Sequence, residues 1–253
     1  MYDITGLTRP QLTALFELLI HRVNTMKMTV PRHTRLPVIQ QITATLIYLR
    51  RNRTQADLAC TYAVSQPTIS RMTSQWTQII AETLREWIPT GDDLREGETY
   101  LVDGTLVPSW SWKDHREDWS GKHKTTGRNL ITVSLLDGTL VCVSDAFPGS
   151  THDLAALRET HFLETPNTLW IGDKGFVGPD GITTPIKRKP GQQRLEPDQV
   201  EHNRRVSSER APIERANAQF KTWRILHTDY RRPHDTHDET ITAVLGLEFW
   251  RNS

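Results

Sequence analysis

Three acidic residues stand where a carboxylate could take part in catalysis: Asp103, Asp173 and Glu214. Asp103 lies inside an apolar run, and burying an aspartate is costly unless it is paired or binds a cation. Asp173 ends a second apolar run, and ligands gather at strand ends in α/β folds. Glu214 falls within a long helical stretch. Each acid also has an ordinary alternative role, since aspartates at strand ends often cap the turn that follows.

Taken together, the three acids suit phosphodiester chemistry. Carboxylates held close together repel one another, and divalent cations relieve that repulsion. Mg²⁺ takes few carboxylate ligands and keeps room for phosphate oxygens. Two such ions about 4 Å apart can activate the attacking oxygen of a displacement and stabilise the leaving oxygen. This chemistry favours an enzyme that acts on the backbone of a nucleic acid.

Basic residues accompany the last of the three acids. Arg210 lies four residues before Glu214 and Lys221 seven residues after it, so all three share a face if this segment is a helix. The two cations could hold phosphates on either side of a metal, or simply form ion pairs on an exposed helix. Residues 187–232 contain 12 Lys or Arg against 6 Asp or Glu, in a chain whose net charge is only +1. Such clustering suits a phosphate backbone, although an ordinary solvated surface fits it as well.

The segments that must position these acids alternate between strands and helices. Asp137-Gly138 between two apolar runs is a strong hairpin signal. The expected strands are 100–107, 130–136, 139–144, 168–173 and 182–186, and the expected helices are 153–163, 197–226 and one around 241–249. This order predicts an α/β domain with a mixed sheet, a leading antiparallel hairpin and helices on both faces, as in the ribonuclease H-like fold.

The part of the chain before residue 90 is expected to be helical. Apolar residues recur at helical spacing after Thr8 and again over residues 37–50. Two further helices should follow, the first capped by Thr54 and the second by Ser65, with Pro67 tolerated in the first turn of the second. This layout is typical of a helix-turn-helix, whose second helix enters the major groove of DNA.

The second helix of this pair would present a polar face to DNA. Ile69 and Met72 should pack inward. Gln and Arg side chains can read base edges, while Ser and Thr can hold phosphates. The candidate DNA-binding residues of this helix are Gln66, Thr68, Ser70 and Arg71. Ala63 stands where such a turn often has glycine, and a plain helical hairpin is the alternative interpretation.

A polar stretch, Pro89-Thr90-Gly91-Asp92, marks the expected boundary between two domains. We expect an all-α helix-turn-helix domain over residues 1–90 and a catalytic domain over residues 91–253. Apolar residues make up 36% of the chain, which is enough to build packed cores. Cys60 and Cys142 are far apart and lack the spacing of a zinc site, so both are expected to be small buried residues.

Nothing in the sequence points to a membrane or to secretion. No run approaches the ~20 apolar residues that span a bilayer. The first residues lack the basic-then-apolar order of a signal peptide. We therefore expect a soluble, cytoplasmic protein that is associated with the nucleoid.

Two other motifs have open interpretations. Trp110, Trp112 and Trp119 stand among basic residues, where they could stack on unpaired bases or pack at the seam between the domains. His152-Asp153 could suggest a metal phosphohydrolase, but the further ligands of such a site cannot be placed. We therefore expect Asp153 to cap its helix, close to the active site.

The motifs around these acids also occur in an order that is similar to a known family. They are Val102-Asp103-Gly104-Thr105, Ser120-Gly121-Lys122-His123, Pro148-Gly149-Ser150-Thr151-His152-Asp153, Gly172-Asp173-Lys174-Gly175-Phe176, Thr184-Pro185-Ile186-Lys187, Arg210 with Glu214 and Lys221, and Trp223-Arg224-Ile225-Leu226. In these motifs the chain resembles the DDE transposases of bacterial insertion sequences, most closely the insertion-sequence-five group related to PIF/Harbinger elements. The resemblance covers nearly the whole chain, including the helix-turn-helix.

The resemblance implies a ribonuclease H-like domain in which Asp103, Asp173 and Glu214 are catalytic and bind two Mg²⁺ or Mn²⁺ ions. It implies cleavage at transposon ends, followed by attack of the 3′-hydroxyl on target DNA. The expected partners are duplex DNA, namely the terminal inverted repeats and the target, and a second copy of the chain, because two ends must be joined. The residues expected to hold DNA near the cut are Lys122, Lys174, Arg210 and Lys221.

Several alternatives stay open at this point. Glu209 is a rival third acid, although Glu214 matches the motif and Glu209 does not. Related families often place tyrosine three residues before the arginine, where this chain has Ser207. The alternative functions are a catalytically idle DNA-binding regulator derived from a transposase, and a ribonuclease H-like nuclease without strand transfer. The helix-turn-helix favours duplex DNA over RNA, because A-form RNA hides its major groove from side chains.

Overall fold

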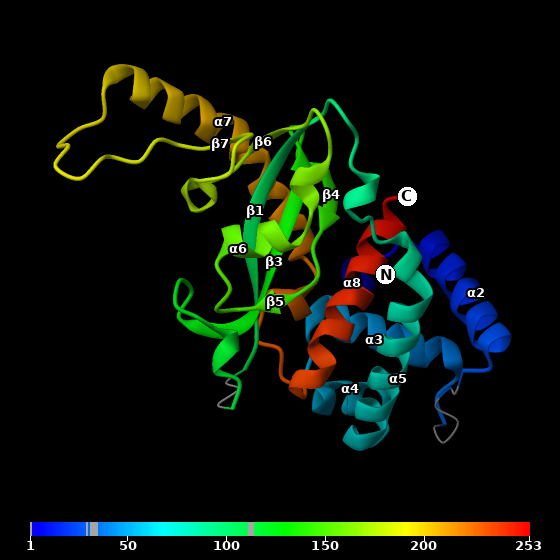
Figure 1. The fold of residues 1–253 in the computed structure, drawn as a ribbon. Coiled ribbons are helices and arrows are strands. Elements are labelled where there is room, and N and C mark those ends of the chain that lie inside the picture. The colour runs from blue at the N-terminus through cyan, green and yellow to red at the C-terminus, as the bar shows by residue number, and fades with distance from the viewer. Residues whose placement is uncertain (1, 29, 31–34, 111–113) are drawn as a thin grey trace. The chain divides into compact units, whose positions relative to one another are not determined.

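The computed structural model describes all residues except 1, 29, 31–34 and 111–113. Contacts divide the chain into two units, coloured along the sequence in Figure 1. Unit 1 consists of residues 1–88 and 221–253, and unit 2 consists of residues 89–220. Among the residues that the sequence singled out, Trp112 lies outside the described ones.

Unit 2 is built on a mixed β-sheet, as expected. Its strands are β1 (Thr99–Pro108), β2 (Trp119–Ser120), β3 (Thr125–Leu135), β4 (Leu140–Val143), β5 (Phe147–Pro148), β6 (Leu169–Ile171) and β7 (Ile182–Thr183). Their order is β2-β3-β1-β6-β7, and β4 and β5 also pair with β3. β1 and β3 are antiparallel, β6 runs parallel to β1, and β7 runs parallel to β6. β3 and β4 form the expected antiparallel hairpin around Asp137-Gly138.

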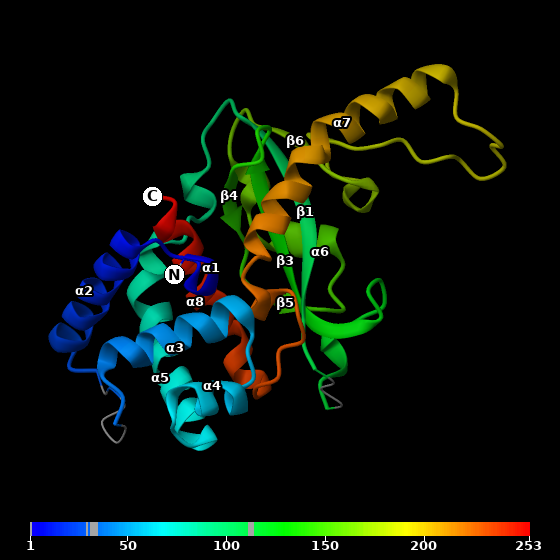
Figure 2. The same cartoon turned by 180° about the vertical axis from the view of Figure 1, so that it is seen from behind.

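Helices cover both faces of this sheet. α6 (Asp153–Glu159) lies on one face (Figure 1) and α7 (Pro197–Phe220) on the other (Figure 2). Side chains along a strand point alternately to the two faces, so β1 contributes to two cores. The core on the α6 face contains Leu94, Tyr100, Val102, Ile131, Val133, Cys142, Ala156, Leu157, Phe162, Trp170 and Phe176. The core on the α7 face contains Leu101, Ile171, Val206 and Ile213.

Short 3₁₀ turns complete both units. Those of unit 2 are η2 (Gly91–Asp93), η3 (Arg116–Asp118), η4 (Phe162–Glu164) and η5 (Lys174–Phe176), and those of unit 1 are η1 (Arg85–Trp87), η6 (Arg224–Leu226) and η7 (His234–Thr236). η5 directly follows Asp173, so it bears on the site described below.

The helices of unit 1 pack around α5. They are α1 (Tyr2–Thr5), α2 (Arg9–Met26), α3 (Val38–Arg51), α4 (Gln55–Tyr62), α5 (Gln66–Leu84) and α8 (His237–Arg251). α2, α3, α4 and α8 all contact α5. Trp76 of α5 is fully buried, and its indole N–H donates to Gln41 Oε1 at 3.0 Å, so its polar atom is satisfied. Gly246 lets α8 approach closely, since a Cβ there would come within 2.6 Å of the Leu84 Cβ.

α4 and α5 form the expected helix-turn-helix, and local sequence sets where each helix begins. Thr54 Oγ1 accepts a hydrogen bond from the Asp57 backbone N–H at 3.1 Å. Ser65 Oγ accepts one from the Thr68 backbone N–H at 3.4 Å. Each cap satisfies a backbone donor that the first turn of its helix leaves without a partner.

Residues 221–253 depart from the expected domain division. The sequence assigned them to a catalytic domain, but they pack with the N-terminal helices. Trp223 supplies the physical reason, because its ring is fully buried in unit 1. Its indole N–H donates to Glu248 Oε2 at 2.6 Å, and the Arg50 guanidinium lies 5.2 Å from the ring centroid. Unit 2 starts at Pro89, and the sequence-based boundary near residue 90 stays a prediction.

Some expected elements have different bounds. α7 ends at Phe220, whereas the sequence extended this helix to Leu226, because Trp223 is held in unit 1. α6 ends at Glu159, before the apolar Phe162 and Leu163 that the sequence included. β7 spans only Ile182–Thr183 of the expected 182–186.

The two cysteines differ from each other in burial. Cys142 is buried, as expected, and lies in the core on the α6 face. Cys60 is exposed, so the expectation that it would be buried is wrong. It stands on the outer side of the short helix α4, where Leu58 and Ala59 take the inward positions.

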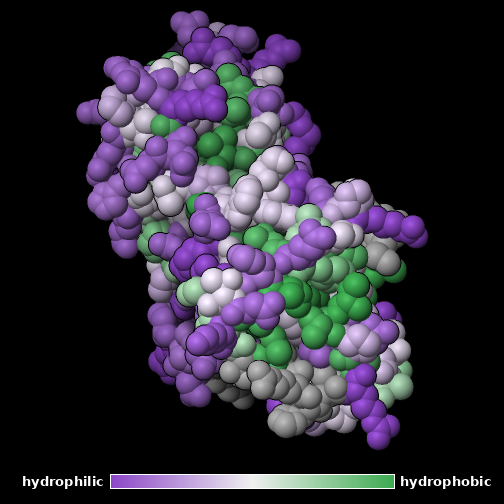
Figure 3. Space-filling model, turned by 90° about the vertical axis from the view of Figure 1, so that its right-hand side faces the viewer, coloured by the Kyte–Doolittle hydropathy of each residue, from purple (hydrophilic) through white to green (hydrophobic). Residues whose placement is uncertain are grey.

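Apolar side chains are not confined to the cores. Ile4, Met26 and Ile39 of unit 1 remain 48%, 56% and 56% exposed. Figure 3 shows hydrophobic residues interspersed with hydrophilic ones on one face of the molecule. Among the described residues, no helix combines the length and the apolar character that crossing a membrane requires.

Ala63 ends α4 in the left-handed region, with φ at 51°. This conformation costs a residue with a Cβ about 1–2 kcal/mol and costs glycine little. Replacing Ala63→Gly should therefore raise the free energy of unfolding by about 0.5–1 kcal/mol, after allowing for the greater chain entropy of glycine. Urea denaturation followed by circular dichroism would measure the change.

Ala56→Gly is the matched control for this prediction. Ala56 is exposed on the same helix but has right-handed helical geometry. Glycine there should lower the free energy of unfolding by about 0.5–1 kcal/mol. The two substitutions should thus have opposite signs, and destabilisation by both would contradict the strain argument at Ala63.

Candidate active site

Asp103 lies in β1 on the face that α7 covers, because it alternates with Leu101, which packs there. Two side chains of α7 reach its carboxylate. Asn217 Nδ2 donates to Asp103 Oδ2 at 2.9 Å, and Arg210 Nη2 lies 3.5 Å from Asp103 Oδ1. The Asp103 side chain keeps 23% of its surface exposed, so a ligand can still reach the carboxylate from solvent.

The electrostatic setting of Asp103 disfavours its ionised form. Burial raises the pKa of Asp103 to about 6. Neighbouring charges modify this pKa in both directions: Arg210 and Lys122 lower it, whereas Asp173 and Asp153 raise it. The carboxylates of Asp173 and Asp153 are therefore close enough to repel that of Asp103. A carboxylate in such a setting is well suited to a cation, which supplies the opposite charge.

The parallel pairing of β1 and β6 brings Asp173 to the same place. Leu101 in β1 is the partner of Ile171 in β6. Continuing that register by two residues aligns Asp173 with Asp103 on the same face of the sheet. The carboxylate of Asp173 is also held locally, because its Oδ1 accepts a hydrogen bond from the Gly175 backbone N–H at 2.6 Å. The structure thus brings two of the three expected acids together.

Glu214 is an exposed residue of α7. It lies four residues after Arg210 and three before Asn217, so the three side chains share one flank of the helix. Both of those neighbours contact the carboxylate of Asp103, so this flank borders the site. Within the described part of the chain, Glu214 forms no ion pair, and its carboxylate is accessible to a cation.

The rival acid Glu209 has a different setting. Its Oε1 lies 4.0 Å from Arg205 Nε, one turn earlier on α7. Five residues separate Glu209 from Glu214, which rotates their side chains apart by about 140° around the helix. Glu209 therefore does not share the flank that Arg210 and Asn217 present to Asp103.

Asp153 approaches the sheet from the α6 face. Lys122 Nζ donates to its Oδ2 at 2.8 Å, and Asn129 Nδ2 donates to its Oδ1 at 2.9 Å. Gly104 makes this approach possible, since a Cβ there would lie 2.3 Å from the Asp153 Cγ. The carboxylate of Asp153, which Lys122 and Asn129 already contact, therefore lies against Gly104, the residue that follows Asp103.

The expectation that Asp153 caps α6 is wrong. His152 is the N-cap residue, and its Nδ1 accepts a hydrogen bond from the Leu154 backbone N–H at 3.3 Å. Asp153 occupies the first helical position, and its carboxylate is already engaged by Lys122 and Asn129.

Two buried polar atoms beside Asp103 have no hydrogen-bond partner among the described residues. They are Nε of Arg210 and Oδ1 of Asn217. Leaving a buried acceptor unsatisfied costs about 1–3 kcal/mol, so the Asn217 oxygen calls for a donor or a cation. Carboxylate and amide oxygens are the ligands that hard divalent cations prefer. The donor set beside Asp103 therefore fits a divalent cation.

The expected basic residues are divided between the two units. Lys122 is 58% exposed and pairs with Asp153, and Lys174 is exposed in η5, next to Asp173. Lys221 was expected on the helix two turns beyond Glu214, and this is wrong. α7 ends one residue earlier, and Lys221 belongs to unit 1.

Two asparagines of the site were missed by sequence reasoning. Asn217 lies seven residues after Arg210, the same helical spacing that separates Lys221 from Glu214, so this spacing could have predicted that Asn217 shares the face of Arg210. Asn129 is buried in β3, and a polar residue within a largely apolar run is the same signal that marked Asp103. Both asparagines hold carboxylates in place.

The four expected DNA contacts of α5 differ in their settings. Arg71 and Gln66 are exposed, so they are accessible to bases. Thr68 belongs to the helix cap, because its hydroxyl lies 2.9 Å from that of Ser65. Ser70 is half-buried one turn after Gln66. The structure therefore puts all four in the first turns of the second helix, with Thr68 least available to a ligand.

Two family models match the chain over separate regions. Residues 34–86 match the helix-turn-helix of DDE superfamily endonuclease, which contains α4 and α5. Residues 102–248 match the DDE superfamily endonuclease itself. The second match contains Asp103, Asp173 and Glu214, and it extends beyond unit 2 into α8.

Two curated relatives resemble the chain over most of its length. One is described as a transposase for insertion sequence element IS112 of Streptomyces albus G, and it is 28% identical over 219 residues, which cover 86% of this chain and 80% of the relative. The other is described as a transposase for insertion sequence element IS702 of Microchaete diplosiphon. It is 24% identical over 226 residues, covering 85% of this chain and 81% of the relative.

The geometry and the family matches agree. The family match for the endonuclease spans more than half of the chain and contains Asp173 and Asp103, whose carboxylate α7 contacts. The domain is suited to divalent cations, and the helix-turn-helix is suited to DNA. The chain therefore belongs to the DDE superfamily endonucleases, enzymes that act on DNA, and it carries their helix-turn-helix.

Proposed function

We propose that the protein is a DNA transposase, which cleaves at the ends of its element and joins the 3′-hydroxyl ends to target DNA. Family membership and the two relatives described as transposases support this function. The observation that carries the proposal is the parallel register of β1 and β6, which pairs Leu101 with Ile171, the residues two positions before Asp103 and Asp173. Paired carboxylates next to a third one on a helix suit phosphodiester cleavage and transfer.

Asp103, Asp173 and Glu214 are the residues that would hold two Mg²⁺ or Mn²⁺ ions. When bound, such ions would activate the attacking oxygen and stabilise the leaving oxygen of an in-line displacement. Arg210 and Asn217 keep the Asp103 carboxylate oriented through their contacts with its two oxygens. The protein thereby holds its ligands in position before the DNA arrives, which limits the reorganisation needed for reaction.

Basic residues around the carboxylates bind the DNA backbone in this proposal. Lys174 follows Asp173 directly and is exposed to solvent. Lys122 is exposed and is held by Asp153, so its ammonium group has a defined position. Arg210 serves both Asp103 and the DNA phosphates. Lys221, just beyond α7, contributes to DNA binding from the start of the C-terminal segment.

The division of labour that we propose follows the sequence. Residues 1–90 bind duplex DNA at the terminal inverted repeats, with Gln66 and Arg71 reading bases. Residues 91–253 carry out catalysis on those ends and on target DNA, although residues 221–253 pack in unit 1. A dimer or a larger assembly joins the two ends of one element. This work takes place in the cytoplasm, at the nucleoid.

Cleavage and joining of labelled duplexes that carry the element's terminal inverted repeats would test this function. With Mg²⁺ or Mn²⁺ present, wild-type protein should cut the repeat end and join it to target DNA. Asp103→Asn and Asp173→Asn should each reduce both reactions at least about 100-fold, because a bound metal contributes several kcal/mol to the transition state. Asp180→Asn, at an exposed aspartate of unit 2, is the matched control and should retain activity.

The same assay separates the alternative functions. Specific binding of the repeat without any cleavage would favour an idle regulator. Metal-dependent cutting without joining would favour a nuclease that lacks strand transfer.

Glu214→Gln and Glu209→Gln should have unequal effects in that assay. Glu214 shares the flank of Arg210 and Asn217, so its loss should lower cleavage at least about 100-fold. Glu209 forms only an exposed ion pair with Arg205, so its loss should change cleavage by less than about fivefold. The reverse pattern would make Glu209 the third metal ligand.

Protons and metal ions should compete for Asp103. Its folded pKa of about 6 exceeds the ordinary aspartate value of 3.8, so its contribution to folding is most favourable below pH 3.8 and is lost as the pH rises through about 6. Without metal, this loss should amount to roughly 3 kcal/mol. Asp103→Asn removes the ionisable group, so the free energy of unfolding of the variant should increase relative to that of wild type as the pH rises from 3.8 to about 6.

Urea denaturation in chelator at a series of pH values would measure this difference. Adding Mn²⁺ at pH 7 should then stabilise the wild type and leave Asp103→Asn nearly unchanged, because a ligand stabilises only the state that binds it. Parallel pH profiles for the two proteins would contradict the buried setting of Asp103. An equal response to Mn²⁺ would contradict its role as a metal ligand.

A further inference from the structure

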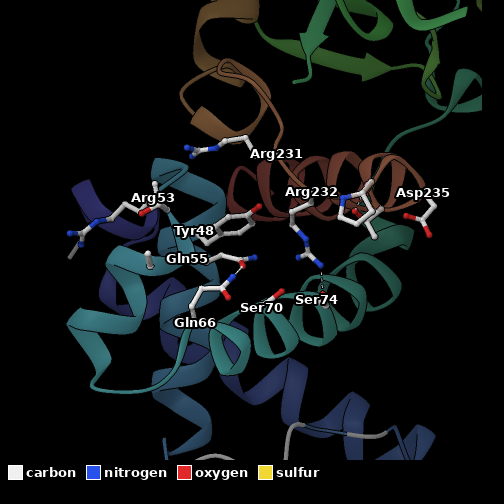
Figure 4. Close-up of a pocket in the computed structure, with 13 residues that line it drawn as sticks. Tyr48, Arg53, Gln55, Gln66, Ser70, Ser74, Arg231, Arg232 and Asp235 are labelled. Atoms are coloured by element: carbon white, nitrogen blue, oxygen red, sulfur yellow. Dashed lines mark hydrogen bonds between the residues drawn. The ribbon is translucent and has the colours of Figure 1, made fainter. Parts of the chain in front are cut away.

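A pocket of about 610 Å³ lies within unit 1, alongside the helix-turn-helix (Figure 4). Gln66, Ser70 and Ser74 line it from α5. These residues are spaced four apart, so they form a single stripe along the helix. Residues 53–56 at the start of α4, together with Tyr48, line another side. The C-terminal segment completes the lining with residues 231–233, 235 and 236.

The charges that line this pocket are mainly positive. They are the three arginines Arg53, Arg231 and Arg232 against one carboxylate, that of Asp235. Arg53 is neutralised by Asp57, since their side chains lie 2.5 Å apart. The other two arginines therefore set the charge of the pocket.

Arg231 and Arg232 contact uncharged groups. Arg231 Nη2 donates to the Asn52 carbonyl oxygen at 2.8 Å, and Arg232 Nη2 donates to Ser74 Oγ across the pocket (Figure 4). Burial raises the pKa of Glu239, and Arg232 is close enough to that carboxyl to lower it in turn. Over the described ranges, however, neither arginine forms an ion pair with a carboxylate. Two guanidinium charges thus remain for a ligand.

We propose that Arg231 and Arg232 bind backbone phosphates, one each, of the duplex whose major groove receives α5. A helix in the major groove has a phosphate backbone on each side, and the stripe that faces this pocket begins at Gln66, one of the expected base contacts. Guanidinium groups, with the hydroxyls of Ser70 and Ser74 beside them, match the oxygens of a phosphodiester. This inference rests on the proposed recognition of duplex DNA by α5.

The DNA-binding surface is therefore assembled from two distant parts of the chain. The helix-turn-helix match ends at residue 86, so it does not include residues 231–236. The buried Trp223 anchors the start of this C-terminal segment in unit 1. Folding of the segment onto unit 1 thus adds phosphate contacts that the helix-turn-helix lacks by itself.

The salt dependence of DNA binding tests the proposal. Full-length protein would be titrated, in chelator to prevent cleavage, onto fluorescent duplexes carrying either the terminal repeat or a scrambled sequence. Arg231→Ala and Arg232→Ala should each lower the slope of log K against log salt by about 1, on both duplexes alike. At about 0.1 M salt, each should weaken binding roughly fivefold to tenfold.

Matched variants separate a local phosphate contact from a loss of folding or of net charge. Arg231→Lys and Arg232→Lys keep the charge and should keep most of the slope. Arg85→Ala removes an exposed arginine just beyond the other end of α5 and should leave the slope unchanged. Thermal unfolding would confirm that each variant is folded, which matters most for Arg232 because it contacts Ser74.

The outcomes distinguish this inference from the proposed function. Unchanged slopes for both alanine variants, or an equal loss for Arg85→Ala, would overturn the phosphate site while leaving end recognition intact. A wild type that binds both duplexes equally would contradict end recognition by α5. In that case a reduced slope for the alanine variants would still uphold the phosphate contact.

Discussion

The carboxylate of Asp103, held within an otherwise apolar strand, constrains much of unit 2. A lone carboxylate in that position is costly, and burial raises its pKa to about 6. The fold lowers this cost with Asn217 and Arg210, which reach across from α7. The position of α7 on the sheet therefore depends on contacts with Asp103, which the proposed chemistry also requires. Among the residues that the structure describes, the Asn217 Oδ1 atom has no hydrogen-bond partner, as expected if the arrangement is complete only with a cation.

The alternation of β1 separates two tasks. Leu101 and Asp103 point to α7, where Ile213 and Val206 supply an apolar floor and the exposed flank carries Glu214. Val102 and Gly104 point to the other face, where Asp153 fits only because Gly104 lacks a Cβ. Asp153 in turn fixes Lys122. One strand thus positions the Asp103 carboxylate on one face of the sheet and makes room for the ion pair of Asp153 with Lys122 on the other.

Unit 1 joins sequence-distant elements around α5. The caps of Thr54 and Ser65 define the helix-turn-helix, and Gly246 lets α8 approach α5. Trp223 anchors the C-terminal segment by burying its ring and donating to Glu248. The basic excess of residues 187–232 is consequently divided equally between the two units, with +3 in residues 187–220 of unit 2 and +3 in residues 221–232 of unit 1, where Arg231 and Arg232 lie beside the helix-turn-helix.

Local signals in the sequence predicted the helix-turn-helix and the mixed sheet, and they marked Asp103 and Asp173 as candidate catalytic acids. Caps, apolar periodicity and an acid within an apolar run depend only on neighbouring residues, so they can be recognised without coordinates. The tertiary structure decided where α7 ends and that residues 221–253 pack in unit 1. It also decided that Asn217, and not Lys221, lies on the α7 face beside Asp103 and contacts its carboxylate. Finally, it decided that the Asp153 side chain contacts Asn129 instead of capping α6. Each of these depends on contacts between residues far apart in the chain, whose energies no local pattern records.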